Sequence, residues 1–318
     1  MFAYIIRRLI IALVVLVLVT LVIFLIMHLL PGDPVLLFIS QERFEQINPE
    51  ELAAARHQFG VDRPLVTQYF DWLGGLAHGD LGNSIFTGGP VIDEIARALP
   101  ISLYLGLLAF VFSHAIAIPA GVICAVRRGK WIDTALTVFA NLGITAPTFW
   151  VGVILIYIFG FYLGWLPIYG YTSPFDDFWL STKRAILPVF CESLGILSGC
   201  VRQTRSAMLE VIRQDYIRTA WSKGLRERTV IIRHALKNGI IPVVTLAGMS
   251  IPMILSGSVL IENVFSIPGM GRLATEALFS RDYAITQGVA LLMALAVVLS
   301  NLLVDISYGW LDPRVRYD

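Results

Sequence analysis

Six long apolar segments alternate with polar stretches along this chain. They cover residues 9–30, 101–126, 134–160, 186–204, 239–261 and 284–308. A membrane-spanning helix needs about 20 mostly apolar residues, so each segment is long enough to cross a bilayer. The fourth is the weakest, because Glu192 and several glycines interrupt it. The pattern predicts an all-α, polytopic membrane protein with about six transmembrane helices.

The first apolar segment follows two basic residues, Arg7 and Arg8, and continues to Leu30. A secretory signal has a core of only about 7–15 apolar residues and then a small-residue cleavage site. Here the sequence LPGDP follows instead. We therefore expect residues 1–30 to be a retained first transmembrane helix.

The composition supports a membrane protein. Hydrophobic residues make up 57% of the chain and charged residues only 15%, with a mean hydropathy of +0.74, whereas soluble domains are about 25% charged. The three cysteines are Cys124, Cys191 and Cys200. The last two are predicted to lie on opposite faces of one helix, about 13 Å apart along its axis, too far for a disulfide. We expect three unpaired, buried thiols and no metal site.

Basic residues are distributed unevenly along the chain. With the N-terminus in the cytoplasm, 16 of the 24 Lys and Arg residues fall on the inside, and six spans also place the C-terminus there. Outside, residues 31–99 hold ten acids and four bases; inside, residues 202–237 hold three acids and nine bases. The opposite signs suit different partners on the two faces, although the positive-inside bias alone would also explain the basic loop. The net charge of +1 suggests no nucleic-acid partner.

The outer stretch, residues 31–99, carries helix signals. Asn48 can cap a helix that has Pro49 at its first position, and Gly60 is a stop signal. A second helix is predicted from Pro64 to about Leu76. This stretch is therefore predicted to be folded.

Several catalytic motifs are absent from the sequence. No phosphate-binding loop occurs, since Gly129-Lys130 is followed by Trp131 and lacks the upstream glycine. Neither H-E-x-x-H nor G-x-S-x-G occurs. We expect no catalytic residue, no metal site and no hydrolysis of ATP by this chain.

Ionisable residues within the apolar segments are few: His114, Glu192 and Asp305. An ion-coupled carrier normally needs such groups as its ion or proton site. Glu192 can be a structural residue near the lipid headgroups or can line a substrate path, and His114 can be a satisfied core histidine. The sequence therefore favours a membrane pathway whose energy comes from another protein.

A polar island, residues 215–243, separates the fourth and fifth apolar segments. Positions Met208, Val211, Ile212, Asp215, Tyr216, Thr219 and Ala220 follow the spacing of one helix face. Gly224 is expected to break that helix, and a second helical piece, Glu227–Asn238, leads to Pro242 at the start of the next span. Ala220 and Gly224 are small enough for a partner's backbone to approach closely.

Two interpretations of the island remain open. It can dock into a groove of a soluble partner, or it can be an amphipathic connector lying on the bilayer surface. The candidate docking residues are Asp215, Tyr216, Thr219, Ala220, Trp221, Lys223, Gly224 and Leu225.

The island resembles the cytoplasmic EAA loop of ATP-binding-cassette (ABC) importer permeases. Thr219-Ala220-Trp221, Gly224 and Pro242 occupy the places of that loop's small-residue pair, glycine and proline, with Trp221 where a small residue is usual. Five further stretches are similar to the dipeptide, oligopeptide and nickel branch of the family. They are LPGDP at 30–34, GDLGNS at 79–84, LPIYG at 166–170, ENVFSIPGMGRL at 262–273 and LDPRVR at 311–316, with Ile267 where the branch often has Trp.

The resemblance implies a type I importer permease fold in a bacterial-type inner membrane. It implies a second homologous permease, two cytoplasmic subunits that bind ATP and Mg, and a periplasmic or lipid-anchored substrate-binding protein, with membrane lipid around the spans and no cofactor on this chain. The helix Tyr216–Leu225 would couple the ATPases to the spans. The substrate would be a peptide or a related small solute such as a nickel chelate or glutathione.

Three parts follow from this interpretation. Residues 1–30 would form the first transmembrane helix, residues 31–99 a periplasmic helical segment, and residues 100–318 a five-helix permease core with the EAA loop at about 205–238.

Candidate path and gate residues complete the prediction. Small polar residues and a proline can line a wet cavity or pack helices together; those in the third and fifth apolar segments are Asn141, Thr145, Pro147, Ser256 and Ser258. A periplasmic gate, or alternatively an ordered outer connector, is predicted at Glu262, Asn263, Phe265, Pro268 and Gly269.

Two other functions are weighed against an importer subunit. A self-contained, ion-coupled secondary transporter would use Glu192 and His114 as coupling sites. A membrane enzyme or assembly scaffold would need reactive groups clustered at one depth, and the sequence offers no such cluster.

Overall fold

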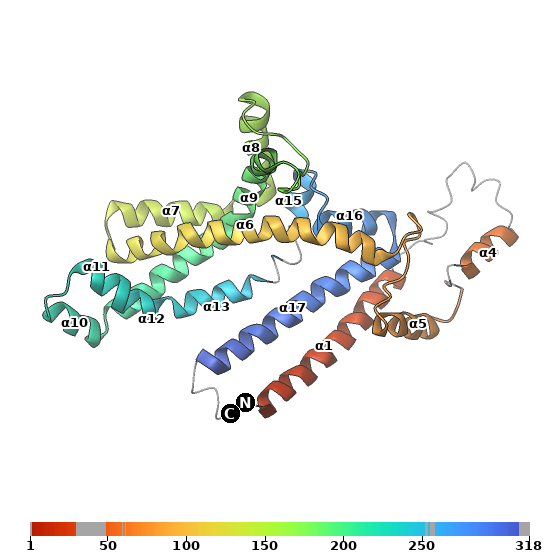
Figure 1. Cartoon of the computed structure of the whole chain (residues 1–318), viewed down its shortest axis with the longest axis horizontal. Coiled ribbons are helices and arrows are strands. Elements are labelled where there is room, and N and C mark those ends of the chain that lie inside the picture. Colours follow the sequence, from red (N-terminus) through yellow and green to blue (C-terminus); the bar gives the residue numbers. More distant parts are fainter. Residues whose placement is uncertain are drawn as a thin grey trace. The chain divides into compact units, whose positions relative to one another are not determined.

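The computed structural model describes residues 2–29, 49–58, 60, 62–251, 254 and 258–311, and the regular elements among them are helices (Figure 1). The chain divides into two compact units, residues 1–102 with 268–318 and residues 103–267. The predicted LPGDP motif, Ser256 and residues 312–316 lie outside the described residues.

The first unit is built on two long apolar helices. Helix α1 (Phe2–Leu29) packs against α17 (Tyr283–Leu311) and α5 (Leu65–Ala77) (Figure 1). The unit also contains α4 (Pro49–Gln58), the start of α6 (Val91–Val126) and α16 (Met270–Ser280). Its buried core consists of Val91, Ile95, Ala98, Met270, Ala277, Ile285 and Val289.

The outer stretch is folded, as predicted. Helix α4 begins at Pro49, while the predicted cap, Asn48, lies outside the described residues. Gly60 follows that helix with a φ of +68°, and Pro64 is the N-cap of α5. The Tyr69 hydroxyl lies 3.1 Å from Thr20 Oγ1, so α5 is anchored on the first apolar helix by a polar contact.

The second unit is organised around α9 (Phe178–Ile212). Helices α7 (Trp131–Thr145), α8 (Thr148–Leu155) and α13 (Ile241–Met249) pack against it. The other elements are the π-helical segments η1 (Ile156–Tyr162) and η2 (Val230–Leu236), and the helices α10 (Asp215–Ser222), α11 (Glu227–Thr229), α12 (Lys237–Gly239) and α15 (Val259–Val264). Its central core contains Ala117, Cys124, Ala140, Leu197, Cys200, Val201 and Val243.

Two glycines bring helices close to α9 in this unit. A Cβ added to Gly121 would lie 2.5 Å from Thr204 Cβ, and one added to Gly143 would lie 2.5 Å from Ser198 Oγ. Only a residue without a side chain allows α6 and α7 to approach α9 this closely.

Four helices of the described part are long and apolar enough to cross a membrane, and two bent pairs raise the number to as many as six. The predicted span count is therefore compatible with the structure. The all-α prediction is confirmed. The three cysteines are free and buried, also as predicted.

Two predicted spans are wrong as continuous helices. The third, 134–160, is divided between α7 and α8 by a bend of 100°. Ala146 adopts an extended conformation with a ψ of 127°, because a residue before proline avoids the helical region. The fifth, 239–261, is interrupted at Ser250, a turn that follows the end of α13 at Met249, and at Ser258, which is extended before α15 begins at Val259.

Candidate functional site

The predicted docking island contains a short, separate helix, α10. The chain leaves α9 at Arg213, and Gln214 is extended with a ψ of 149° before α10 begins at Asp215. The interpretation that Met208 to Ala220 form one helix face is therefore wrong. The i, i+3, i+4 spacing continues across a break that it does not reveal.

Two side chains hold α10 on the rest of the unit. Ile217 is 0% exposed and Ala220 is 6% exposed. They pack in a cluster with Ala125, Met208, Val230, Ile231 and Ala235. The small side chain of Ala220 thus lets α10 lie close to its own chain. Ile217 was not among the predicted site residues, although an apolar residue three positions before Ala220 was a usable signal.

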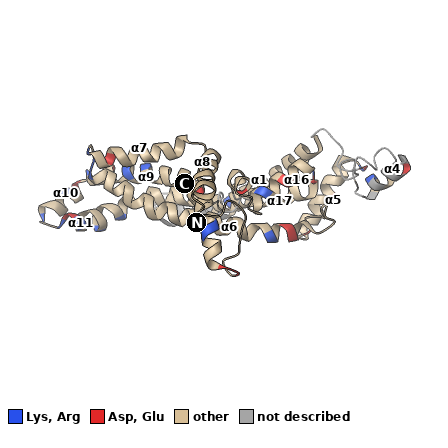
Figure 2. Cartoon of the chain, turned by 90° about the horizontal axis from the view of Figure 1, so that it is seen from above, with Lys and Arg blue, Asp and Glu red and all other residues tan. Residues whose placement is uncertain are grey.

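The remaining predicted residues of α10 are exposed. They are Asp215, Tyr216, Thr219 and Trp221, followed by Lys223, Gly224 and Leu225 in the turn. Figure 2 shows the Lys and Arg positions around α10 and α11 in blue. A short helix therefore presents aromatic, acidic and basic groups on the sides that its own chain leaves uncovered.

Gly224 ends α10, as predicted. Its φ is +73°, and its N–H donates to the Trp221 carbonyl at 2.9 Å. An added Cβ would meet no atom within 4 Å, so glycine is needed here for the left-handed backbone conformation. After the turn, the Asn238 side-chain amide donates to the Tyr216 hydroxyl at 2.8 Å and connects α12 to α10.

Pro242 lies in the first turn of α13, as predicted. The missing N–H of proline is tolerated there because the first N–H groups of a helix have no partner inside that helix.

The predicted path residues lie at the two breaks in the apolar segments. Asn141, Thr145 and Pro147 are exposed near the bend between α7 and α8, where the Thr145 hydroxyl donates to the Asn141 carbonyl at 3.1 Å. Ser258 is the N-cap of α15. Asn141, Thr145 and Pro147 are not among the residues that line the cavity at Ser258.

Ser258 instead lines a cavity of about 360 Å³ that the prediction did not include. Helix α9 contributes Glu192, Gly195, Ile196 and Gly199, and the other lining residues are His114, Thr148, Leu246, Met249, Ser250 and Ile261. His114 is only half satisfied: Nδ1 donates to the Phe110 carbonyl at 2.8 Å, and buried Nε2 has no partner among the described residues.

The predicted gate segment is well packed. Glu262 is 2% exposed and Phe265 is also buried, whereas Asn263 and Pro268 are exposed. Gly269 is buried. The Phe265 carbonyl accepts a hydrogen bond from Gly170 N at 2.9 Å, and its ring lies 3.2 Å from where a Cβ of Gly152 would be. Residues 262–264 thus belong to α15, which packs against α8, and the predicted gate remains a prediction.

Nearly the whole chain matches two models of one protein family. Residues 117–317 match the model described as "Binding-protein-dependent transport system inner membrane component", and residues 1–106 match the model of the N-terminal part of such membrane components. The chain belongs to this family. It is a multi-pass membrane protein and a permease subunit of an ABC transport system.

Individual relatives span the whole permease. A peptide transport system permease protein of Brucella abortus (strain 2308) is 41% identical over 319 residues. The oligopeptide transport system permease protein AppB of Bacillus subtilis (strain 168) is 38% identical, and the dipeptide transport system permease protein DppB of Alkalihalophilus pseudofirmus is 37% identical. Each of the three alignments covers 100% of both chains.

A solved structure supports the fold of the permease. A chain of the MetNI methionine ABC transporter in an inward-facing conformation aligns with a TM-score of 0.56 at 17% identity. The alignment covers 70% of this chain and 97% of that chain. The predicted ABC importer permease fold is thereby confirmed.

An ion pair that the sequence did not reveal fixes α7 to α9 in the permease. Arg205 Nε and Nη2 donate to the two oxygens of Asp133 at 2.7 and 2.9 Å. Gly129 N also donates to Asp133 at 3.0 Å. Arg205 is three residues before Met208 of the α10 cluster, so the pair secures the part of α9 on which α10 rests.

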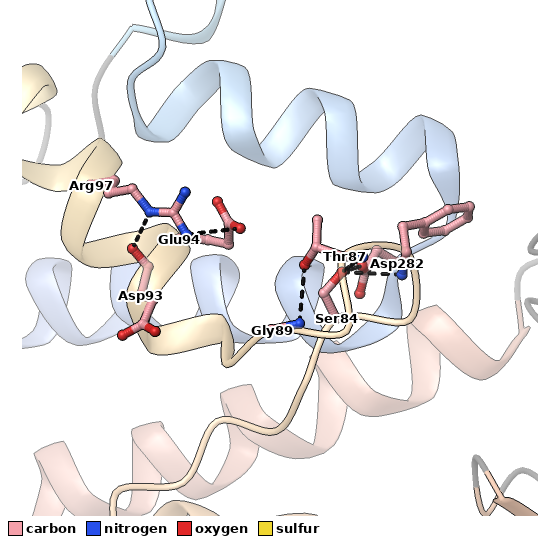
Figure 3. Close-up of polar contacts among 8 residues, drawn as sticks. Ser84, Thr87, Gly89, Asp93, Glu94, Arg97 and Asp282 are labelled. Atoms are coloured by element: carbon pink, nitrogen blue, oxygen red, sulfur yellow. Dashed lines mark hydrogen bonds and ion pairs between the residues drawn. The ribbon is translucent and has the colours of Figure 1, made fainter.

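The GDLGNS stretch has a structural role in the first unit. The Ser84 hydroxyl donates to the Asp282 carboxylate (Figure 3). The same carboxylate accepts from Ile285 N at 3.2 Å at the start of α17. Both side chains are buried. This polar contact fixes the loop after α5 to the last long helix of the permease, a pairing that the sequence alone did not indicate.

Proposed function

We propose that this permease forms half of a peptide-import pathway and receives its energy from ATPase subunits that dock on α10. The observation that carries the proposal is the attachment of α10 by Ile217 and Ala220, with Tyr216, Trp221 and Asp215 left exposed. A recognition helix needs this division, because one face must be anchored while another remains available to the partner.

The contacts of α10 give it a route for transmitting force. Ile217 belongs to the same buried cluster as Met208 of α9 and Ala125 at the end of α6. Helices α9 and α6 are both long, and Asp133 of α7 is paired with Arg205 of α9. A push on α10 is therefore delivered to three helices at once. Docking would shift the permease between two arrangements by binding one more tightly than the other.

The proposal includes the other subunits and the orientation. Two cytoplasmic subunits would bind and hydrolyse ATP with Mg, a second homologous permease would complete the pathway, and a periplasmic or lipid-anchored binding protein would deliver the substrate. The basic residues around α10 would face the cytoplasm, and both termini would lie on the same side. The spans would sit in a bacterial inner membrane.

The proposed substrate is a peptide because full-length relatives carry the names of peptide, oligopeptide and dipeptide permeases. Related small solutes, such as a nickel chelate or glutathione, are the alternatives within the same function.

The test removes the exposed side chains of α10 and leaves its anchor intact. The variant Trp221→Ala with Lys223→Ala should insert normally, because both side chains are exposed and the contact between Tyr216 and Asn238 is kept. It should lose the ATPase subunits on co-purification after mild solubilisation, and it should lose ATP-driven peptide uptake.

Trp179→Ala is the matched control. Trp179 is an exposed aromatic residue near the start of α9, at the opposite end of that helix from α10, so this variant should retain the ATPase subunits. Full retention by the α10 variant would overturn the docking proposal. Uptake by the purified chain alone, driven by a proton gradient, would favour the ion-coupled carrier instead.

A further inference from the structure

The cavity on α9 lies entirely within the second unit. Its volume of about 360 Å³ falls in the range of about 300–1,000 Å³ that is usual for small-molecule sites. Much of the lining is apolar, including Ile196, Leu246, Met249 and Ile261. A few polar groups in an apolar cavity are typical of sites that orient one end of a ligand.

Two glycines of α9 keep the cavity open. Gly195 and Gly199 follow Glu192 by three and seven positions, so the three residues share one helix face. An added Cβ at either glycine would meet no atom within 4 Å. Close helix packing explains why Gly121 and Gly143 are glycines, but it does not explain Gly195 and Gly199. The absence of side chains at Gly195 and Gly199 leaves open space on the helix face beside Glu192.

Glu192 is the charged group of the cavity. No described residue forms a hydrogen bond or an ion pair with it, and the nearby Glu262 carboxyl, which is buried, has the same sign. The cavity lining contains no Lys or Arg. A carboxylate within a membrane protein is costly unless a positive partner compensates it, so a ligand with a positively charged group would complement this site.

We propose that Glu192 binds the protonated amino group of a short peptide while the apolar lining holds its side chains. The inference rests on the proposed peptide substrate. A peptide suits the site better than a bare ion, because the cavity is wide and largely apolar. Moreover, no group of three or more His, Cys, Asp or Glu residues in the described ranges is placed to hold a metal.

The test measures equilibrium binding to the purified full chain in lipid nanodiscs, without the binding protein, by calorimetry. The probes are alanyl-phenylalanine and N-acetyl-alanyl-phenylalanine, which differ in the charged amino group. The wild type should prefer the free amine by about tenfold, the effect of one hydrogen bond to a charged group. Glu192→Gln should abolish that preference, since it removes the charge at nearly constant volume.

Two further variants separate charge from space. Glu210→Gln makes the same change at an exposed position of α9 and should keep the preference. Gly195→Leu should weaken both probes together by filling the cavity. Equal affinity of the wild type for the two probes, or an unchanged preference in Glu192→Gln, would overturn the amine site. Loss of the second permease from Gly195→Leu, with unchanged peptide binding, would identify the glycine face as a subunit interface and would also overturn it.

The inference and the proposed function fail in different ways. If ATPase subunits dock on α10 but Glu192→Gln keeps the preference, only the amine site is wrong. If the wild type prefers the free amine but no ATPase docks, the proposed coupling is wrong and the amine site stands.

Discussion

Asp133 and Glu192 are two carboxyl groups of the same unit with opposite surroundings. Asp133 accepts two hydrogen bonds from Arg205 and one from Gly129 N. Glu192 has no such partner in the described part of the chain and lines a cavity. A buried charge with hydrogen-bond partners therefore belongs to the scaffold, whereas one without partners beside open space is available to a ligand.

The largest expected effect is the difference in stability between variants that lack one or the other carboxylate. Asp133→Ala leaves the Arg205 side chain, which is 30% exposed, without its ion-pair partner and should lower the free energy of unfolding by about 3 kcal/mol. Glu192→Gln should change it by less than about 1 kcal/mol, because no polar contact is lost. Denaturant unfolding in mixed micelles measures both, and equal losses would contradict the distinction.

A close-packed glycine of the second unit gives the next largest expected effect. Gly121→Ala would place a Cβ 2.5 Å from Thr204 Cβ and 2.8 Å from the Val201 carbonyl oxygen. The helices must then separate, at a cost of about 2 kcal/mol. The midpoint of denaturant unfolding reports this loss, and a midpoint equal to that of the wild type would show that α6 and α9 are not in close contact.

The turn after α10 gives a smaller expected effect. Gly224→Ala forces a residue with a Cβ to keep a φ of +73°, which costs about 1–2 kcal/mol. Because the space around it is open, the loss should appear locally as faster amide hydrogen exchange in α10. Unchanged exchange in α10 would mean that the left-handed turn does not hold this helix in place. Gly60→Ala, a left-handed glycine in the other unit, is the control and should leave α10 unaffected.

The smallest expected effect is an increase in stability. Gly195→Ala adds a methyl group where no atom lies within 4 Å and replaces a poor helix former by a good one, so it should stabilise the permease by up to about 1 kcal/mol. Thermal unfolding of the two proteins side by side checks it. A clear loss of stability would show that Gly195 is a packing glycine like Gly121.

Local signals in the sequence predicted the features that depend on neighbouring residues. Gly224 was predicted to end the docking helix, and Pro242 to begin the next one, because backbone restrictions at glycine and proline act within a few residues. Pro147 carried the same kind of signal. Pro147, predicted as a path residue, lies where the third span is divided between α7 and α8.

Other features depend on contacts between distant residues. Asp133 and Arg205 are 72 positions apart. The sequence around either residue gives no sign that the two form an ion pair. The helical spacing from Met208 to Ala220 hid the break at Gln214, because an apolar periodicity does not register one extended residue. Ile217 was missed for the same reason, since the assumed face turned it outward.

The measurement that most directly tests the central claim is site-specific crosslinking from α10 in the assembled transporter. Arg218→Cys introduces an exposed thiol on that helix, while the three native thiols are buried. The account predicts a crosslink to an ATP-hydrolysing subunit and labelling by a membrane-impermeant reagent from the cytoplasmic side alone. Labelling from the external side, or a crosslink to the substrate-binding protein in place of the ATPase, would contradict it.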